Sequence, residues 1–306
     1  MNAEEAPGPI DGSGAVAVVT GGAGGMGRSI ATALLRRGAT VVIADIEKGA
    51  LDACVEELSA LGDESGGTVS GVVTDVSDEI SLAALADRVF ADHGRCNLLF
   101  LNAGVTSGGG GLPWQQEPND WRWCFGVNVF GVAIGTSEFV PRMISSGEPG
   151  QVIVTSSGDG GFAPVAQASV YAASKAAVSC FTEALQLNLT KEGVPIGASV
   201  FYPSGGLMDT GLYTAARNRP EHLQRKGEGT GRKSFTFEEL KDRIASATGT
   251  EPKVADMAAL GEFAVDGALE RRFIIAHDLD ETAELLHRRA DAIGNAQLPP
   301  AHKIGI

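Results

Sequence analysis

The residues best suited to chemistry in this sequence are a tyrosine and a lysine four positions apart, Tyr171 and Lys175. They fall at the start of a predicted helix, so their side chains share one face and can act together. An ammonium group beside a phenol lowers the pKa of the phenol toward the working pH. Such a tyrosine can exchange a proton while hydride moves to or from a neighbouring carbon. Taken alone, the pair is equally compatible with a packed tyrosine and an exposed lysine on an ordinary helix.

A second motif is a glycine-rich run directly after an apolar run of strand type, Thr20-Gly21-Gly22-Ala23-Gly24-Gly25-Met26-Gly27. Gly21 permits a tight turn, Gly25 lets the backbone approach a pyrophosphate, and Gly27 lets the following helix pack closely on the strand. Free N–H groups at the start of that helix would meet the negative charge. The run predicts a dinucleotide site, and the alternative is a β–α turn without a ligand.

The choice of dinucleotide depends on Asp45, which ends the second predicted strand. Its carboxylate can accept hydrogen bonds from an adenosine ribose and would repel a 2′-phosphate. Ile46 follows it, so no cation stands beside it to receive that phosphate. We therefore predict NAD as the preferred cofactor. NADP remains the alternative through three nearby cations that otherwise form a solvated helix face, Arg28, Arg36 and Arg37.

The elements that position these residues follow from the hydrophobic pattern. Apolar runs rich in β-branched residues predict seven buried strands, at Ala15–Thr20, Thr40–Asp45, Thr68–Thr74, Asn97–Leu101, Gln151–Thr155, Ile196–Tyr202 and Arg272–Ala276. Helical spacing of apolar residues fills the segments between them, including Met26–Arg37, Leu51–Leu61, Leu82–His93 and Ser174–Lys191. Buried strands joined by helices form a doubly wound parallel sheet. We expect an α/β protein with a seven-stranded Rossmann fold in a single domain.

Five motifs in chain order resemble the short-chain dehydrogenase/reductase family: the glycine run, Asn102-Ala103-Gly104, Asn128, a serine pair and Tyr171-x-x-x-Lys175. The resemblance extends from about Ala15 to Thr210 and implies hydride transfer between NAD and an alcohol or ketone. It implies a catalytic set of Ser157, Tyr171, Lys175 and Asn128. It implies cofactor contacts from Gly21, Gly25, Met26, Gly27, Asp45, Ile46, Asp75, Val76, Asn102, Ala103, Gly104, Tyr171, Lys175, Pro203 and Thr210.

The serine pair departs slightly from the family pattern. The family places a serine that binds the substrate oxygen at the end of the fifth strand, where Ser156 and Ser157 both stand. We favour Ser157, although it lies fourteen residues before Tyr171 and the family interval is thirteen. A one-residue insertion within Gly158–Ala168 would reconcile the two counts. Ser156 stays open as the catalytic residue or as a cap at the end of the strand.

Other roles also follow from the resemblance. Asn128 is similar to the asparagine that holds a water linking the lysine to solvent, and Asp75 to the residue that meets the adenine. Asn102-Ala103-Gly104 is similar to the turn that borders the cofactor. Without a ligand these would be a buried polar residue and strand-ending turns. We expect Pro203 to lie against the nicotinamide ring. Thr210 corresponds to a family residue that contacts the nicotinamide carboxamide or a phosphate, although the loop before it is longer here than is usual in the family.

The remaining segments suggest the domain boundaries and the substrate. We expect a flexible tail at 1–13, a catalytic domain at 14–277 with a substrate loop at 204–249, and a helical extension at 278–306. The pocket should be lined by Val105–Trp114, Gly158–Val165 and Leu207–Tyr213, which offer Trp114, Phe162, Leu207, Met208 and Tyr213. These side chains carry few charges. They predict a bulky, largely apolar secondary alcohol of aryl, terpenoid or steroid type, oxidised to its ketone.

Composition excludes several other classes of partner. The formal charge of −14 repels phosphate backbones and anionic lipid, so we expect neither nucleic acid nor membrane as a partner. No apolar run approaches the ~20 residues of a membrane span, and the chain starts with acidic residues in place of a signal segment, which favours the cytoplasm. The 4 cysteines are widely spaced without a CxxC pair, so we expect reduced thiols and no metal site.

Three alternatives to an NAD-dependent dehydrogenase stay open. One is a non-catalytic NAD-sensing regulator, one is an NADP-dependent ketone reductase, and one is a relative that epimerises or dehydrates nucleotide-linked sugars. The intact set of Ser157, Tyr171, Lys175 and Asn128 argues against the regulator, because a binding protein has no need of a proton relay. The resemblance also implies a homodimer or homotetramer, formed through the helices after the fourth and fifth strands.

Overall fold

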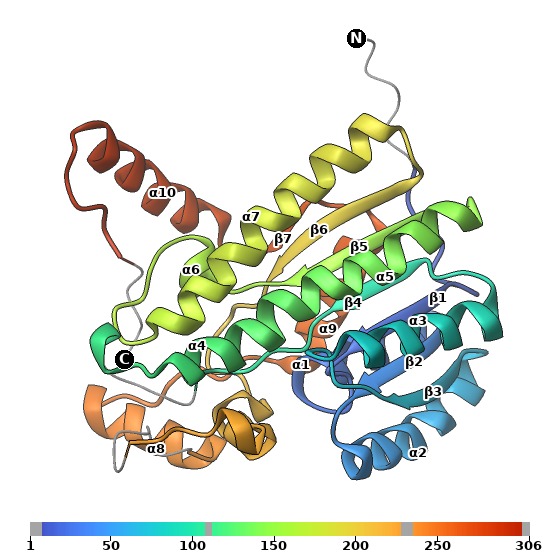
Figure 1. Ribbon diagram of the computed structural model, residues 1–306, viewed down its shortest axis with the longest axis horizontal. Coiled ribbons are helices and arrows are strands. Elements are labelled where there is room, and N and C mark those ends of the chain that lie inside the picture. The colour runs from blue at the N-terminus through green and yellow to red at the C-terminus, as the bar shows by residue number, and fades with distance from the viewer. Residues whose placement is uncertain (1–7, 108–111, 228–234, 302–306) are drawn as a thin grey trace.

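A seven-stranded parallel sheet forms the centre of the protein in the computed structural model, which describes residues 8–107, 112–227 and 235–301 (Figure 1). Its strands are β1 (Val16–Thr20), β2 (Thr40–Asp45), β3 (Thr68–Val73), β4 (Leu98–Leu101), β5 (Gly150–Thr155), β6 (Ile196–Tyr202) and β7 (Ile274–Ala276). The strand order is β3-β2-β1-β4-β5-β6-β7, and every neighbouring pair is parallel. The predicted doubly wound α/β fold is confirmed.

Two apolar cores lie on opposite faces of the sheet, because successive side chains of a strand point to opposite faces. On one face, Val19 and Ile43 pack with α1 (Gly25–Arg36), α2 (Lys48–Ser65) and α9 (Met257–Leu269). On the other face, Val18 and Val42 pack with α3 (Glu79–His93), α5 (Gly131–Ser146) and α7 (Ser169–Glu192). The central strands are therefore buried between two layers of helices (Figure 1).

The prediction that all seven strands are buried is wrong for the edge strand β7, in which Ile275 is buried but Ile274 is exposed, and for β3. Strand β3 lies beside β2 at the other edge of the sheet, and its residues are exposed or half-buried. Val73 keeps 52% of its surface exposed. A β-branched run predicts a strand but does not distinguish an edge from the centre of a sheet.

The two ends of the chain differ in how closely they pack. Residues 8–13 were expected to belong to a flexible tail, yet Ile10 is buried and its N–H donates to the carbonyl of Leu269 at 2.9 Å. Residues 1–7 lie outside the described residues. At the other end α10 (Leu279–Gly294), the expected amphipathic helix, carries no buried residue and projects from the body of the protein (Figure 1).

One continuous helical stretch contradicts the expectation that no segment is long and apolar enough to span a membrane. It comprises α4 (Pro118–Phe125), the π-helix η2 (Gly126–Phe130) and α5, and by length and composition alone Pro118–Ser146 could cross a bilayer. Its 18-residue apolar window is 44% buried inside the protein. A core helix passes the same test, so this stretch is weak evidence for a membrane.

The expected substrate loop is mostly helical where it is described. After Pro203 the chain forms η3 (Gly211–Asn218), η4 (Glu221–Leu223) and α8 (Phe237–Thr248), and residues 228–234 lie outside the described part. Leu207 makes an isolated bridge with Val254. The segment before α8 passes over the carboxyl ends of the strands, where it forms part of a cavity.

Candidate active site

A cavity lies at the carboxyl ends of the central strands, where β1 pairs with β2 on one side and β4 on the other. Such a point, where the chain connections diverge, is the usual ligand site of an open parallel sheet. Almost all predicted site residues line this cavity: Gly21, Gly25, Met26, Gly27, Asp45, Ile46, Asp75, Val76, Asn102, Ala103, Gly104, Ser157, Tyr171, Lys175, Pro203 and Thr210. Asn128 lies behind the cavity wall.

The glycine-rich turn requires glycine at two positions. Gly21 has a φ of +62°, and a β-carbon there would stand 2.9 Å from the Cα of Ala103. A β-carbon on Gly27 would stand 2.1 Å from the carbonyl oxygen of Gly21. The first turn of α1 therefore packs against the strand end, so that its N–H groups face the cavity in the manner that suits a pyrophosphate.

Thr20 ties the ends of two strands together. Its Oγ1 accepts hydrogen bonds from the N–H groups of Asn102 at 2.9 Å and Ala103 at 3.1 Å. The amide of Asn102 donates to the carbonyl of Thr20 at 3.0 Å, and its Oδ1 accepts from the hydroxyl of Thr155. Asn102 is thus a structural link among β1, β4 and β5, and the turn after it borders the cavity as expected.

The carboxylate of Asp45 is held at one end of the cavity. Its Oδ2 accepts from the N–H of Ala23 and its Oδ1 from the N–H of Glu47, both at 3.0 Å. The cations that left NADP open are engaged elsewhere, in the ion pairs Arg28–Glu57, Arg36–Glu262, Arg37–Glu262 and Arg37–Asp266. None of these arginines lines the cavity.

At the other end of the cavity, Tyr171 forms a hydrogen bond with Ser157. Burial raises the pKa of Tyr171 above its ordinary value, and the bond with Ser157 opposes that rise. The protein alone therefore does not produce the lowering of this pKa, which is expected from the lysine together with an oxidised nicotinamide ring. The Lys175 ammonium lies 5.6 Å from the centroid of the Tyr171 ring, and it donates its hydrogen bond to the carbonyl of Thr155 at 2.9 Å.

Lys175 lines the cavity but is buried, with 4% of its surface exposed. Burial disfavours the charged amine and lowers the pKa of Lys175 to about 8. The described surroundings provide one hydrogen-bond acceptor for it, the carbonyl of Thr155. Its protonation state therefore changes close to neutral pH.

The structure separates the roles of the two adjacent serines. The hydroxyl of Ser156 is buried, donates to the carbonyl of Lys175 at 3.1 Å and lies 2.7 Å from the hydroxyl of Ser179. Both serines line the cavity, but Ser157 is half-buried, contacts Tyr171 and accepts from the N–H of Asp159 at 3.1 Å. Geometry thus favours Ser157 as the residue that can reach a substrate, and Ser156 as a support for α7.

Asn128 anchors α7 from behind. Its Oδ1 accepts from the N–H of Val105 at 2.8 Å, and its Nδ2 donates to the carbonyl of Val105 at 3.0 Å and to Ser174 Oγ at 2.9 Å. Ser174 in turn donates to the carbonyl of Tyr171. Both amide hydrogens and the amide oxygen have protein partners, so the side chain positions Tyr171 through Ser174, and the water expected on Asn128 is not needed to explain its burial.

The apolar wall of the cavity differs in part from the one expected. It is formed by Trp123, Val127, Met208, Leu212, Ala215 and Pro220. Of the expected side chains, Met208 lines the cavity. Trp114 is instead 78% exposed, and the ring of Phe162 stacks on that of Tyr202 with 4.1 Å between the ring centroids. Leu207 and Tyr213 do not line it, although Tyr213 lies close enough to raise the pKa of Tyr171. Residues 108–111 of the expected segment lie outside the described chain.

Sequence reasoning overlooked Trp123 and Val127. The two are four residues apart on the helical stretch that carries Asn128, so they share one face, and this spacing was visible in the sequence. Trp123 is 3% exposed and packs with Val105 and Ala215 in a small separate apolar cluster. That cluster joins α4 to the segment that follows β6.

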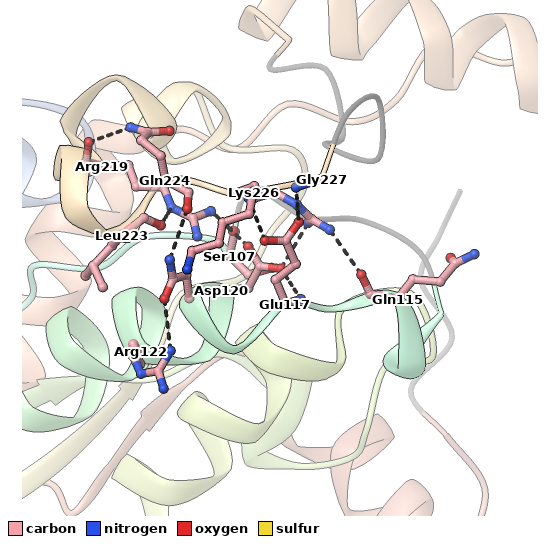
Figure 2. A network of polar contacts seen from close by, with 12 residues as sticks. Ser107, Gln115, Glu117, Asp120, Arg122, Arg219, Leu223, Gln224, Lys226 and Gly227 are labelled. Carbon is pink, nitrogen blue, oxygen red and sulfur yellow. Dashed lines mark hydrogen bonds and ion pairs between the residues drawn. The ribbon is translucent and has the colours of Figure 1, made fainter.

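A buried ionic network fastens this segment to α4 (Figure 2). The carboxylate of Asp120 is fully buried, accepts from Arg219 at 2.9 Å and pairs with Arg225 at 3.0 Å. The guanidinium of Arg219 lies 5.2 Å from the ring of Trp123. Glu117 accepts from the N–H groups of Lys226 at 2.7 Å and Gly227 at 3.0 Å, and these contacts hold residues 219–227 against α4.

The described residues contain no group of three or more His, Cys, Asp or Glu side chains that could hold a metal ion. Cys54, Cys96 and Cys124 are buried, Cys180 is exposed, and all four thiols are free. Burial raises the pKa of the Cys124 thiol to about 11, so this neighbour of Ser174 is uncharged near neutral pH.

Comparison with known proteins finds one matching family model, which is described as short chain dehydrogenase and matches residues 15–220. C alpha-dehydrogenase of Sphingobium sp. (strain NBRC 103272 / SYK-6) is 40% identical over 207 residues, which are 67% of this chain and 64% of that relative. The chain therefore aligns with slightly less than two thirds of that relative. The 1-deoxy-11-beta-hydroxypentalenate dehydrogenase of Streptomyces avermitilis is 33% identical over 239 residues, 77% of this chain and 81% of that relative.

Solved structures agree with the fold. A short-chain dehydrogenase/reductase from Burkholderia phymatum in complex with NAD has a TM-score of 0.82 and 32% identity, covering 96% of this chain and 99% of that one. A metagenomic short-chain oxidoreductase in complex with NADP has a TM-score of 0.56 and 33% identity, covering 63% of this chain and 83% of that one. The first of these two neighbours was therefore solved with NAD and the second with NADP.

Proposed function

Because this chain belongs to the short-chain dehydrogenase family, we propose that it oxidises a bulky, largely apolar secondary alcohol to its ketone with NAD as the hydride acceptor. Family membership makes the chain an oxidoreductase of the alcohol dehydrogenase and ketoreductase class, with a nicotinamide dinucleotide as its cofactor. One observation carries the proposal further. Tyr171, in hydrogen-bond contact with Ser157 and one helical turn from Lys175, faces the same cavity as the glycine-rich turn and Asp45.

Three side chains of the protein would bind the alcohol and transfer its proton. Ser157 would hold the alcohol oxygen, and Tyr171 would take the hydroxyl proton as the hydride leaves the alcohol carbon. The bound oxidised nicotinamide ring supplies the hydride acceptor, and its positive charge favours the phenolate. Lys175 would stabilise the same phenolate from below. Burial alone raises the pKa of Tyr171, so these charges are needed to bring the phenol into its working range.

The preference for NAD follows from charge at the Asp45 end of the cavity. A 2′-phosphate on the adenosine ribose would meet the Asp45 carboxylate, and Arg28, Arg36 and Arg37 are paired outside the cavity. A repulsion of a few kcal/mol corresponds to roughly 10- to 1000-fold discrimination. Since cells generally keep NAD oxidised, oxidation of the alcohol is the proposed direction.

The apolar wall supports the proposed substrate class. Trp123, Val127 and Leu212 present an uncharged surface to the cavity that Tyr171 lines, which suits a ring system better than a short polar alcohol or a sugar. The hydroxypentalenate named for the Streptomyces relative is consistent with this chemistry. Aryl, terpenoid and steroid alcohols form the proposed class.

The test is NADH formation, followed by its ultraviolet absorbance, with a panel of steroid, terpenoid, aryl and short-chain alcohols and with NAD or NADP. We expect NAD-dependent turnover of one bulky class. The Tyr171→Phe variant should lose about 10²- to 10⁴-fold in kcat and keep its affinity for NAD, because the change removes the proton acceptor and leaves the cofactor wall in place. Turnover confined to small polar alcohols, or to NADPH-driven reduction, would refute the proposal.

A further inference from the structure

Glu47 and Arg217 meet across the Asp45 end of the cavity, although 170 residues separate them in the chain. Arg217 Nη2 donates to one carboxylate oxygen of Glu47 at 2.5 Å, and its Nε donates to the other at 3.2 Å. The amide of Asn218 adds a third hydrogen bond to Glu47 at 2.8 Å. All three side chains line the cavity. The β2–α2 turn is therefore joined directly to η3 above it.

The remaining donor of Arg217 is also engaged. Its Nη1 donates to the carbonyl of Gly211 at 3.0 Å and to the hydroxyl of Thr214 at 2.9 Å. These bonds fix the guanidinium on its own helical turn, independently of Glu47. A change at Glu47 would therefore leave Arg217 facing the cavity.

Arg217 is the cation closest to the proposed ribose position. Among the described residues that line the cavity, the lysines and arginines are Lys175 and Arg217, and Lys175 lies at the Tyr171 end. The backbone N–H of Glu47 donates to Asp45 Oδ1 at 3.0 Å, so Asp45, Glu47 and Arg217 form one connected set. A 2′-phosphate on the ribose bound by Asp45 would enter this set.

We propose that Glu47 is a second determinant of cofactor choice, which neutralises Arg217 and thereby prevents it from binding the 2′-phosphate of NADP. Two carboxylates then stand at that end of the cavity against one arginine, and the arginine is already paired. An arginine without its carboxylate partner is a good receptor for phosphate. The inference rests on the proposed NAD-dependent function and assigns to the pair a role beyond that of Asp45.

The experiment measures the affinity of the full chain for NAD and for NADP by titration calorimetry, without any substrate. The variants are Glu47→Gln, Arg217→Gln and the double variant, with Glu57→Gln as a control. Glu57 pairs with Arg28 outside the cavity, so its loss removes a comparable carboxylate–arginine contact elsewhere. Adenosine 2′-phosphate and adenosine 5′-phosphate serve as probes of the phosphate position alone.

We expect Glu47→Gln to improve the affinity for NADP relative to NAD by about tenfold. This is the lower end of the gain that a charge-assisted hydrogen bond can give, because the Arg217 side chain is 43% exposed. The gain should favour adenosine 2′-phosphate over the 5′-phosphate and shrink at high salt. Arg217→Gln and Glu57→Gln should not improve NADP binding. The double variant should lose the gain, because it lacks the cation that produces it.

Two results would overturn the inference while leaving the proposed function intact. One is that the wild type prefers NAD and Glu47→Gln shows the same ratio of NAD affinity to NADP affinity as the wild type. The other is an equal gain in Glu47→Gln and the double variant, which would mean that removing a negative charge is sufficient without Arg217. A wild type that prefers NADP would instead refute the proposed NAD dependence itself.

Discussion

Gly160 lies directly against the backbone of Ala172. A β-carbon at Gly160 would stand 1.9 Å from the carbonyl oxygen of Ala172, and Gly160 has a φ of +99°. Its N–H donates to the carbonyl of Ala163 at 2.7 Å, which closes the short irregular turn after Ser157. Because Ala172 follows Tyr171 on α7, this contact sets the distance between the serine turn and the tyrosine helix.

We therefore expect Gly160→Ala to reduce kcat by at least tenfold and to lower the free energy of unfolding by well over ~1 kcal/mol, since both the conformation and the contact oppose a side chain. Gly147→Ala is the matched control. Gly147 also has a positive φ, +71°, but nothing lies within 4 Å of the added carbon. It should cost about 1 kcal/mol and leave kcat unchanged. Thermal melts and turnover assays of both variants give the comparison. Equal losses of stability and of kcat in the two variants would contradict the proposed role of the Gly160 contact.

The adjacent serines give a second prediction. Ser157→Ala should lower kcat by about 10²-fold or more with little loss of stability, because its hydroxyl contacts Tyr171 and faces the cavity. Ser156→Ala should lower the free energy of unfolding by roughly 1–3 kcal/mol, because its buried hydroxyl bonds to Ser179 and to the carbonyl of Lys175. Its effect on kcat should be much smaller. Reversed effects in turnover assays and denaturant melts would assign the substrate contact to Ser156.

The buried amine of Lys175 should make stability depend on pH. Its pKa is lowered from 10.5 to about 8 in the folded protein. The unfolded chain therefore binds more protons between about pH 8 and pH 10.5, so this group adds stability as pH rises through that window. Well below pH 8 the shift corresponds to a constant net cost of about 3 kcal/mol for burying the charged amine.

Lys175→Met should accordingly be more stable than the wild type at pH 7, and the difference should shrink toward pH 10. Comparing the two proteins at each pH removes the contribution of other titrating groups. Chemical denaturation across this range is the measurement. A difference that does not change with pH would show that the folded amine keeps its ordinary pKa.

The ionic network of Figure 2 leads to a prediction about the substrate wall. Asp120→Asn leaves Arg219 and Arg225 without their shared carboxylate and should lower the free energy of unfolding by about 3–5 kcal/mol. Because Arg219 also lies over Trp123, KM for the alcohol should rise more than the affinity for NAD falls. Asp92→Asn breaks the exposed pair with Arg88 and should cost at most about 1 kcal/mol. Melts and kinetics of the two variants test this difference.

The sheet could be predicted because its signals are local. Each strand is an apolar run bounded by turn residues, and the predicted runs at Thr40–Asp45 and Ile196–Tyr202 coincide with β2 and β6. The glycine turn was equally readable, since a β-carbon at Gly27 would overlap the carbonyl of Gly21 in the same turn. In both cases the sequence pattern and the physical requirement concern neighbouring residues.

The substrate side could be predicted less well because it depends on contacts between distant segments. Trp114 was expected in the wall and is exposed, whereas Trp123 forms the wall because Arg219 and Ala215 pack against it. The position of the Lys175 amine relative to Tyr171 also depends on such a contact. Spacing places Lys175 beside it, but the amine turns to a carbonyl at the end of β5.

The strand order also has a consequence for how the chain folds. β1 pairs with β4 across about 80 residues, and the Asn97 side chain accepts from the N–H of Val16 across 81. Closing such long loops is slow, and until β4 arrives the edge of β1 stays unpaired and open to other chains. During synthesis, an N-terminal fragment ending before β4 therefore has the glycine turn but lacks Asn102 and Ala103, which hold it in place. Nucleotide binding would thus mark the completion of the central sheet during biogenesis.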